Sequence, residues 1–76
     1  MKLIFENSYN QERVIAEVKD EEEAIKEINK FVDECNAKRT DGKEFKIYYI
    51  RSWEHDGRKI YDVGSHSEFF YLEYDE

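Results

Sequence analysis

Residues 45–65 read FKIYYIRSWEHDGRKIYDVGS, two apolar-rich segments on either side of Asp56-Gly57. An Asp-Gly pair between two such segments is a strong signal for a two-residue β-hairpin turn, because both residues accept positive φ angles. Side chains alternate between the two faces of a strand, so a strand covered on one face should alternate apolar and polar residues. Here apolar side chains occur on both faces. The stretch therefore predicts a hairpin with one core face and a second face that needs another cover.

The Asp-Gly turn also predicts the register of this hairpin. The opposed residues are Trp53 with Ile60, Arg51 with Asp62, Ile50 with Val63, and Tyr49 with Gly64. The opposite charges of Arg51 and Asp62 form a cross-strand pair that contributes about 0.2–1 kcal/mol. The ring of Tyr49 is placed over the bare backbone of Gly64.

The ion pair decides which face of the hairpin points outward, because burying Arg51 and Asp62 against a helix is costly. We therefore expect Tyr49, Trp53 and Ile60 on the outer face with that pair. The inner, core face carries Tyr48, Ile50, Tyr61 and Val63. This strand is expected to run from residue 45 to residue 53.

The first half of the chain predicts a second hairpin followed by a helix. Residues 2–6 and 12–19 read as strands, joined by the turn-forming residues 7–11. Leu3 and Phe5 share one face of the first strand, and Val14, Ala16 and Val18 share one face of the second. Asp20, followed by Glu23, matches a helix N-cap, and the helix is expected to end near residue 37. Its apolar stripe consists of Ala24, Ile25, Ile28, Phe31, Val32 and Cys35.

A turn over residues 40–43 and a last strand over residues 68–74 complete the prediction, with Phe70 and Leu72 in the core. The expected fold class is α+β, with a single helix packed on an antiparallel β-sheet in the order ββαβββ. Residues 1–76 are expected to form a single compact domain, since so short a chain has one core at most. Strand order stays open, and the N-terminal hairpin could either join the sheet or cover the aromatic face.

The net charge of −7 is divided unevenly along the chain. Residues 1–37 and 60–76 each carry −5, whereas residues 38–59 carry +3. Overall repulsion of phosphate argues against a direct nucleic-acid binder. The basic residues Lys38, Arg39, Lys43 and Lys46 form either a small basic edge or an ordinary solvated loop.

No catalytic, cofactor or metal motif is visible, so we expect no enzyme and no cofactor. His55 and His66 lack metal-ligand spacing and are best explained as exposed turn residues. Cys35 lies on the apolar stripe of the helix and, as the one cysteine, has no partner for a disulfide, which fits a reducing cytosol. The sequence has neither a signal-peptide pattern nor an apolar run long enough to span a membrane. We therefore expect a cytoplasmic protein.

Two surfaces are candidates for binding a partner protein. The acidic residues of the helix and of the C-terminal region could imitate nucleic acid or only maintain solubility, and the C-terminal residues are the better acidic patch because Glu and Lys are paired along the helix. The aromatic outer face could bind a different protein, bind a second copy, or be buried under the N-terminal hairpin. The candidate binding residues are Tyr49, Arg51, Trp53, Ile60, Asp62, Glu68, Glu73 and Asp75.

The segments LIFENSYNQERVIAE at 3–17, RSWEHDG at 51–57 and DVGSHSEFFYLEY at 62–74 resemble a group of small uncharacterised proteins of phages and prophages of Gram-positive bacteria. The resemblance implies an accessory protein that binds a host protein in the bacterial cytoplasm. Its compact acidic character is similar to that of phage inhibitors, including anti-CRISPR proteins. The expected function is therefore inhibition of a nucleic-acid-acting enzyme, such as a CRISPR or restriction nuclease. The alternative is a homo-oligomeric phage structural or assembly component.

Overall fold

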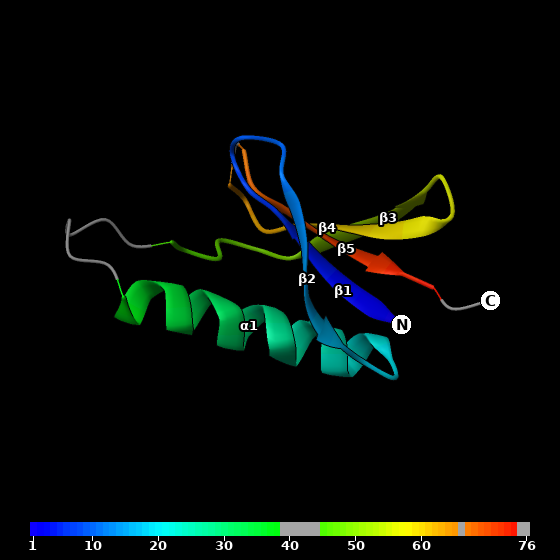
Figure 1. The fold of residues 1–76 in the computed structure, drawn as a ribbon. Coiled ribbons are helices and arrows are strands. Elements are labelled where there is room, and N and C mark those ends of the chain that lie inside the picture. Colours follow the sequence, from blue (N-terminus) through cyan, green and yellow to red (C-terminus); the bar gives the residue numbers. More distant parts are fainter. Residues whose placement is uncertain (39–44, 66, 75–76) are drawn as a thin grey trace.

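The structure, a computed structural model, describes residues 1–38, 45–65 and 67–74 (Figure 1). Its elements are β1 (Lys2–Glu6), β2 (Glu12–Glu17), α1 (Glu21–Ala37), β3 (Arg51–His55), β4 (Arg58–Asp62) and β5 (Phe69–Glu73). The strands form one antiparallel sheet in the order β2-β1-β5-β4-β3, and α1 lies along one face of it. The predicted α+β fold with the element order ββαβββ is confirmed.

The N-terminal hairpin joins the sheet through β1, which pairs with β5. Of the two alternatives that the sequence left open, the structure therefore selects the first, and the hairpin does not cover the aromatic face. Leu3 and Ile4 of β1 point to opposite faces, yet they are 0% and 5% exposed, so both faces of the sheet are covered at this position.

The core lies between α1 and the facing side of the sheet. Phe70 and Leu72 are fully buried there, which confirms their assignment to the core. The rings of Phe5 and Phe31 approach to 4.7 Å, and the ring of Phe70 lies 5.2 Å from that of Phe5. The buried members of the core are Leu3, Val18, Ala24, Ile28, Val32, Phe45, Tyr61, Val63, Phe70 and Leu72.

Helix α1 begins and ends where its sequence predicts. The Asp20 carboxylate accepts a hydrogen bond from the Glu23 N–H at 2.8 Å, which is the expected N-cap contact. At the other end, the Asn36 side chain bonds both backbone groups of Phe45. It donates to the Phe45 carbonyl at 2.9 Å and accepts from the Phe45 N–H at 2.7 Å. These two bonds connect the last turn of α1 to the segment that leads into β3.

The strand predicted from residue 45 is wrong in its first half, because β3 begins at Arg51. Phe45 is buried and both Ile47 and Ile50 pack on the core, so the inward positions do not keep the period of two that a strand requires. Tyr48 was expected to face the core but is 72% exposed. Its N–H still donates to the Val63 carbonyl at 3.0 Å.

Strand β2 also departs from the prediction, because it contains a β-bulge. Leu3 pairs with Ala16, but the next residue, Ile4, pairs with Val14, so Ile15 is an extra residue. The bulge moves Val14 to the face opposite Ala16, where it is 52% exposed. Strand β2 ends at Glu17 rather than at residue 19.

The turn between β3 and β4 has the predicted form. Asp56 and Gly57 have φ angles of 52° and 79°, as a two-residue turn of type I′ requires. His55, expected in the loop, is instead the last paired residue of β3 and lies opposite Arg58. The predicted turn at 40–43 lies outside the described residues, as do His66, Arg39 and Lys43.

Candidate functional site

The face of the sheet opposite α1, called here the outer face, carries one apolar side chain from each strand in a single row. The strand register places Trp53 beside Ile60, Ile60 beside Tyr71, Tyr71 beside Ile4, and Ile4 beside Val14. The two ends of the row are exposed, by 44% at Trp53 and 52% at Val14. The middle is not, since Ile4 is 5% exposed although α1 lies on the other face of the sheet.

The middle of the outer face is covered by a polar network that the sequence did not predict. The Arg58 guanidinium lies 4.3 Å from the centroid of the Tyr71 ring and donates to both Glu12 oxygens, at 3.1 and 3.0 Å. The Tyr71 hydroxyl donates to Glu6 at 2.9 Å. The network joins β4 to β2, and β1, which carries Ile4, lies between them.

The network changes the acidity of its members. Burial, together with the hydrogen bond to Glu6, raises the pKa of Tyr71 to about 12. The hydrogen bonds from Arg58 lower the pKa of the Glu12 carboxyl. Both shifts favour the protonation states in which the network is intact at neutral pH.

At the β3 end of the outer face lies the hairpin patch, which we define as Tyr49, Arg51, Trp53, Ile60 and Asp62. The predicted register is correct here: Arg51 pairs with Asp62, and Trp53 pairs with Ile60. Arg51 donates to Asp62 at 2.9 Å, and the Arg51 guanidinium lies 5.0 Å from the centroid of the Tyr49 ring. The structure thus brings the five predicted residues together on one side of the sheet.

The buried carboxylate of Asp62 fixes the positions of two other side chains of the hairpin patch, Arg51 and Tyr49. Asp62 is 8% exposed, and its carboxylate accepts hydrogen bonds from Arg51, from the Gly64 N–H at 3.0 Å and from the Tyr49 hydroxyl at 3.4 Å. The bond from Arg51 is the largest cause of the lowered pKa of Asp62, followed by the bond from Gly64. These bonds therefore hold Arg51 and Tyr49 in place. The side chains of Arg51, Tyr49 and Trp53 nevertheless stay exposed to solvent.

On the face that points toward α1, the β3–β4 hairpin is bonded to the rest of the molecule by two side-chain contacts. Lys59 of β4 forms an ion pair with Glu21 in the first turn of α1. The Tyr74 hydroxyl donates to Glu54 of β3 at 3.0 Å. Both contacts join residues at least 20 positions apart, so no local sequence signal could have revealed them.

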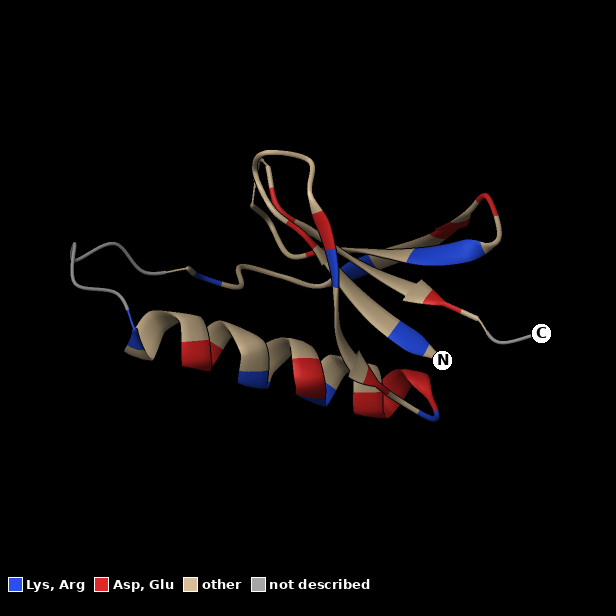
Figure 2. Cartoon of the chain, viewed as in Figure 1, with Lys and Arg blue, Asp and Glu red and all other residues tan. Residues whose placement is uncertain are grey.

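The two described acidic candidates, Glu68 and Glu73, lie at opposite ends of β5. Glu68 precedes β5 and accepts a hydrogen bond from the Ser65 hydroxyl at 3.3 Å, whereas Glu73 ends the same strand. Glu73 lies between Arg58 and Lys2 in the strand register. Asp75 lies outside the described residues. Figure 2 shows that acidic and basic side chains also alternate along α1, with acidic residues gathered in its first turn.

The side chains that the sequence singled out for a catalytic or metal-binding role are His55, His66 and Cys35. His55 is exposed and lies 3.1 Å from the Asp56 carboxylate, and Cys35 is a half-buried free thiol. Within residues 1–38, 45–65 and 67–74, no three His, Cys, Asp or Glu side chains are arranged to hold a metal ion. The same residues include no helix with the length and apolar character needed to cross a membrane.

Comparison with known protein families, curated proteins and solved structures found no match to this chain. The resemblance to phage proteins therefore stays a prediction from the sequence segments that carry it. Any function must be argued from the residues of the hairpin patch and the surfaces around it.

Proposed function

We propose that this chain is a non-catalytic binding protein that holds a partner protein through the hairpin patch. The observation that carries the proposal is that Tyr49 and Trp53 are exposed beside Arg51. The hairpin that carries them is held on its other face by the contacts of Lys59 with Glu21 and of Tyr74 with Glu54. Tyr, Trp and Arg are the residue types that dominate the energy of protein interfaces. Since Asp62 already orders Arg51 and Tyr49, their side chains lose little further freedom on binding.

The partner we propose is a host enzyme that acts on nucleic acid, such as a CRISPR or restriction nuclease in the bacterial cytoplasm. Such enzymes present basic surfaces to their substrate. A chain with a net charge of −7 is attracted to a basic surface, and this attraction raises the association rate. The resemblance to phage proteins supports the same class of partner.

A second candidate is a homo-oligomeric phage component. Strand β3 is at the edge of the sheet, and all five of its residues are exposed. Antiparallel pairing of two copies of β3 about a twofold axis would place Trp53 beside its counterpart. Light scattering separates the two candidates, because a monomer at working concentration excludes the oligomer.

Affinity capture with three variants tests the role of the hairpin patch. We expect Trp53→Ala and Tyr49→Ala to lose a partner that the wild-type chain captures from a lysate of a Gram-positive bacterium. Tyr9→Ala is the matched control, because Tyr9 is 81% exposed in the loop before β2 and lies outside the hairpin patch. Its capture should equal that of the wild type.

The partner class is tested separately by measuring plasmid cleavage by CRISPR and restriction nucleases in the same lysate. We expect the wild-type chain and Tyr9→Ala to slow cleavage, and the two hairpin-patch variants to have no effect. Equal capture by all variants, with their folding verified by circular dichroism, would refute the role of the hairpin patch. Capture without any effect on cleavage would refute only the proposed partner class.

A further inference from the structure

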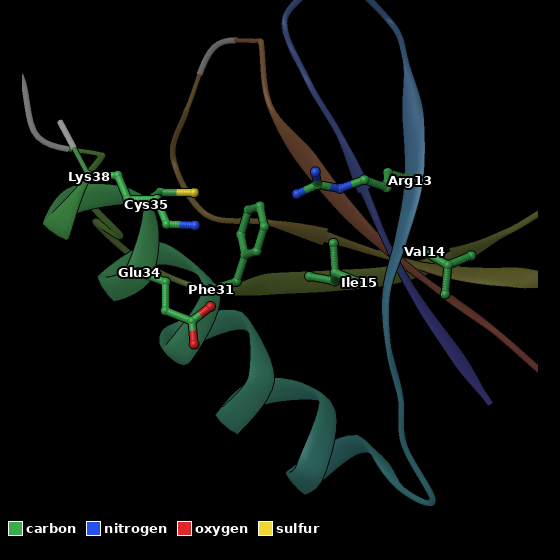
Figure 3. Close-up of a pocket in the computed structure, with 7 residues that line it drawn as sticks. All are labelled: Arg13, Val14, Ile15, Phe31, Glu34, Cys35 and Lys38. Atoms are coloured by element: carbon green, nitrogen blue, oxygen red, sulfur yellow. The ribbon is translucent and has the colours of Figure 1, made fainter.

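A groove separates the edge of the sheet at β2 from the C-terminal half of α1 (Figure 3). Its volume is about 300 Å³, at the lower limit of the roughly 300–1,000 Å³ typical of small-molecule sites. Because β2 is an edge strand of the sheet, no described strand pairs with the edge that faces away from β1. The lining residues are Arg13, Val14 and Ile15 from β2, and Phe31, Glu34, Cys35 and Lys38 from α1.

The groove combines an apolar floor with two cations. Ile15 and Phe31 are partly buried and pack against the core, and the Arg13 guanidinium lies 5.7 Å from the centroid of the Phe31 ring. Among the described residues, neither Arg13 nor Lys38 forms an ion pair. Figure 3 shows the Glu34 carboxylate pointing away from Arg13.

The cations of the groove differ from three other cations on the sheet. Arg51, Arg58 and Lys59 are each bonded to a carboxylate of this chain. The two groove cations, Arg13 and Lys38, are therefore available to a carboxylate of a ligand. The apolar side chains beside them favour a peptide ligand with at least one aliphatic residue. This charge pattern and the unpaired strand edge point to the same kind of ligand.

We propose that the groove binds an extended acidic segment of a partner protein, which adds to the sheet as a new strand beside β2. Strand addition uses the backbone groups of an exposed sheet edge for affinity and the neighbouring side-chain pockets for specificity. The β-bulge at Ile15 interrupts the regular ladder, so the added strand pairs with residues 12–14.

The period of two in a strand defines the preferred sequence of this segment. One side chain of the added strand enters the hollow against Ile15 and Phe31 and is therefore aliphatic. The side chain two positions away lies on the same face, where an Asp or Glu meets Arg13 or Lys38. The groove is at the opposite edge of the sheet from β3, so this site is independent of the hairpin patch.

A nucleic acid and a small molecule fit the groove less well. Two cations on a chain of net charge −7 cannot follow a phosphate backbone. A small molecule would use the hollow but would leave the strand edge without a role.

A charge-swap experiment tests the proposal. The probe is a fluorescein-labelled, capped peptide Thr-Val-Thr-Ile-Thr-Asp-Thr, compared with the same peptide carrying Lys in place of Asp. Fluorescence anisotropy should show that the wild-type chain binds the Asp peptide about tenfold more tightly than the Lys peptide, the effect of about 1.4 kcal/mol. In the double variant Arg13→Glu, Lys38→Glu, the preference should reverse.

Matched controls separate this site from the net charge and from the hairpin patch. Lys46→Glu makes the same charge change as Lys38→Glu, half that of the double variant, at an exposed residue outside the groove, and should keep the wild-type preference within twofold. Trp53→Ala should also bind the Asp peptide normally. Amide chemical shifts on peptide binding should change for residues 12–14 and not for residues 51–55.

Three outcomes would overturn the proposal: no binding of the Asp peptide by the folded wild-type chain, no reversal in the folded double variant, or shifts confined to β3. If the double variant does not fold, Lys38→Glu alone supplies the same comparison, because Lys38 follows the last residue of α1 and is exposed. A fourth such outcome is a dimer in sedimentation whose amide chemical shifts at residues 12–14 change on dilution, because the β2 edges would then pair with each other.

Discussion

Asp62 and Gly64 are close neighbours in the chain that shape the hairpin patch in different ways. Asp62 acts through its carboxylate, which holds Arg51 and Tyr49. Gly64 acts through the side chain that it lacks, because Tyr48 and Tyr49 pack against its bare backbone. The sequence predicted the contact between Tyr49 and Gly64 from the hairpin register, although the regular pairing does not extend that far.

We expect Gly64→Ala to lower the free energy of unfolding by about 2–3 kcal/mol. Its φ of 91° is unfavourable for alanine, and the new Cβ would lie 3.0 Å from the Tyr48 Cβ and 3.2 Å from the Tyr49 Cε2. Urea denaturation measures the loss. Because Tyr49 must move, partner binding through the hairpin patch should weaken as well.

Gly57→Ala is the control for this substitution. Gly57 has a similar φ of 79°, but a Cβ there meets no atom within 4 Å. Only the backbone cost remains, about 1 kcal/mol. Equal losses in the two variants would show that the tyrosines do not constrain Gly64.

At the scale of elements, the end of α1 and the segment before β3 depend on each other through Asn36. The segment 45–50 has no regular strand pairing. Because Phe45 is buried, its backbone N–H and carbonyl need hydrogen-bond partners within the protein. Asn36 supplies both. The sequence offered no signal for this contact, since an asparagine near the end of a helix has many common explanations.

We expect Asn36→Ala to destabilise the fold by about 1–3 kcal/mol, because it leaves a buried N–H and a buried carbonyl without their partner. Asn36→Asp keeps the acceptor for the Phe45 N–H and should show a smaller loss. Asn29→Ala is the matched control, because Asn29 donates only to the Ile25 carbonyl within α1. Thermal and urea unfolding of the three variants give the comparison, and a loss at Asn29 equal to that at Asn36 would contradict it.

At the scale of the whole molecule, the bond between Arg58 and Glu12 connects strands that are three positions apart in the sheet. It covers the middle of the outer face, and so limits the exposed apolar surface to the hairpin patch and the β2 edge. The two residues are 46 positions apart in the chain. Their contact exists only because β1 and β5 pair in the centre of the sheet.

A double-mutant cycle with Arg58→Gln and Glu12→Gln should give a coupling of about 0.5–1 kcal/mol at pH 7, modest because both side chains are partly exposed. The pKa of Glu12 is lowered in the folded state from its ordinary value of 4.5. The coupling is therefore complete above about pH 4.5 and disappears as the pH falls through the lowered pKa. Urea unfolding at pH 7 and at acid pH tests this, and an unchanged coupling at acid pH would contradict it.

The sequence by itself determined the elements and contacts that depend on near neighbours in the chain. Asp20 and the apolar stripe defined α1, and Asp56-Gly57 defined both the turn and the pairing of Arg51 with Asp62. Such signals are reliable because capping and two-residue turns involve few residues and definite backbone angles.

Only the tertiary structure decided which strands are neighbours and what each face exposes. The bulge in β2 moved Val14 to the outer face, because a shift of one residue in register exchanges the faces of a strand. The pairing of β1 with β5 brought Arg58 to Glu12 and opened the groove beside β2. These features depend on contacts between segments that are distant in the chain. Such contacts form together when the core packs, so no local sequence pattern predicts them.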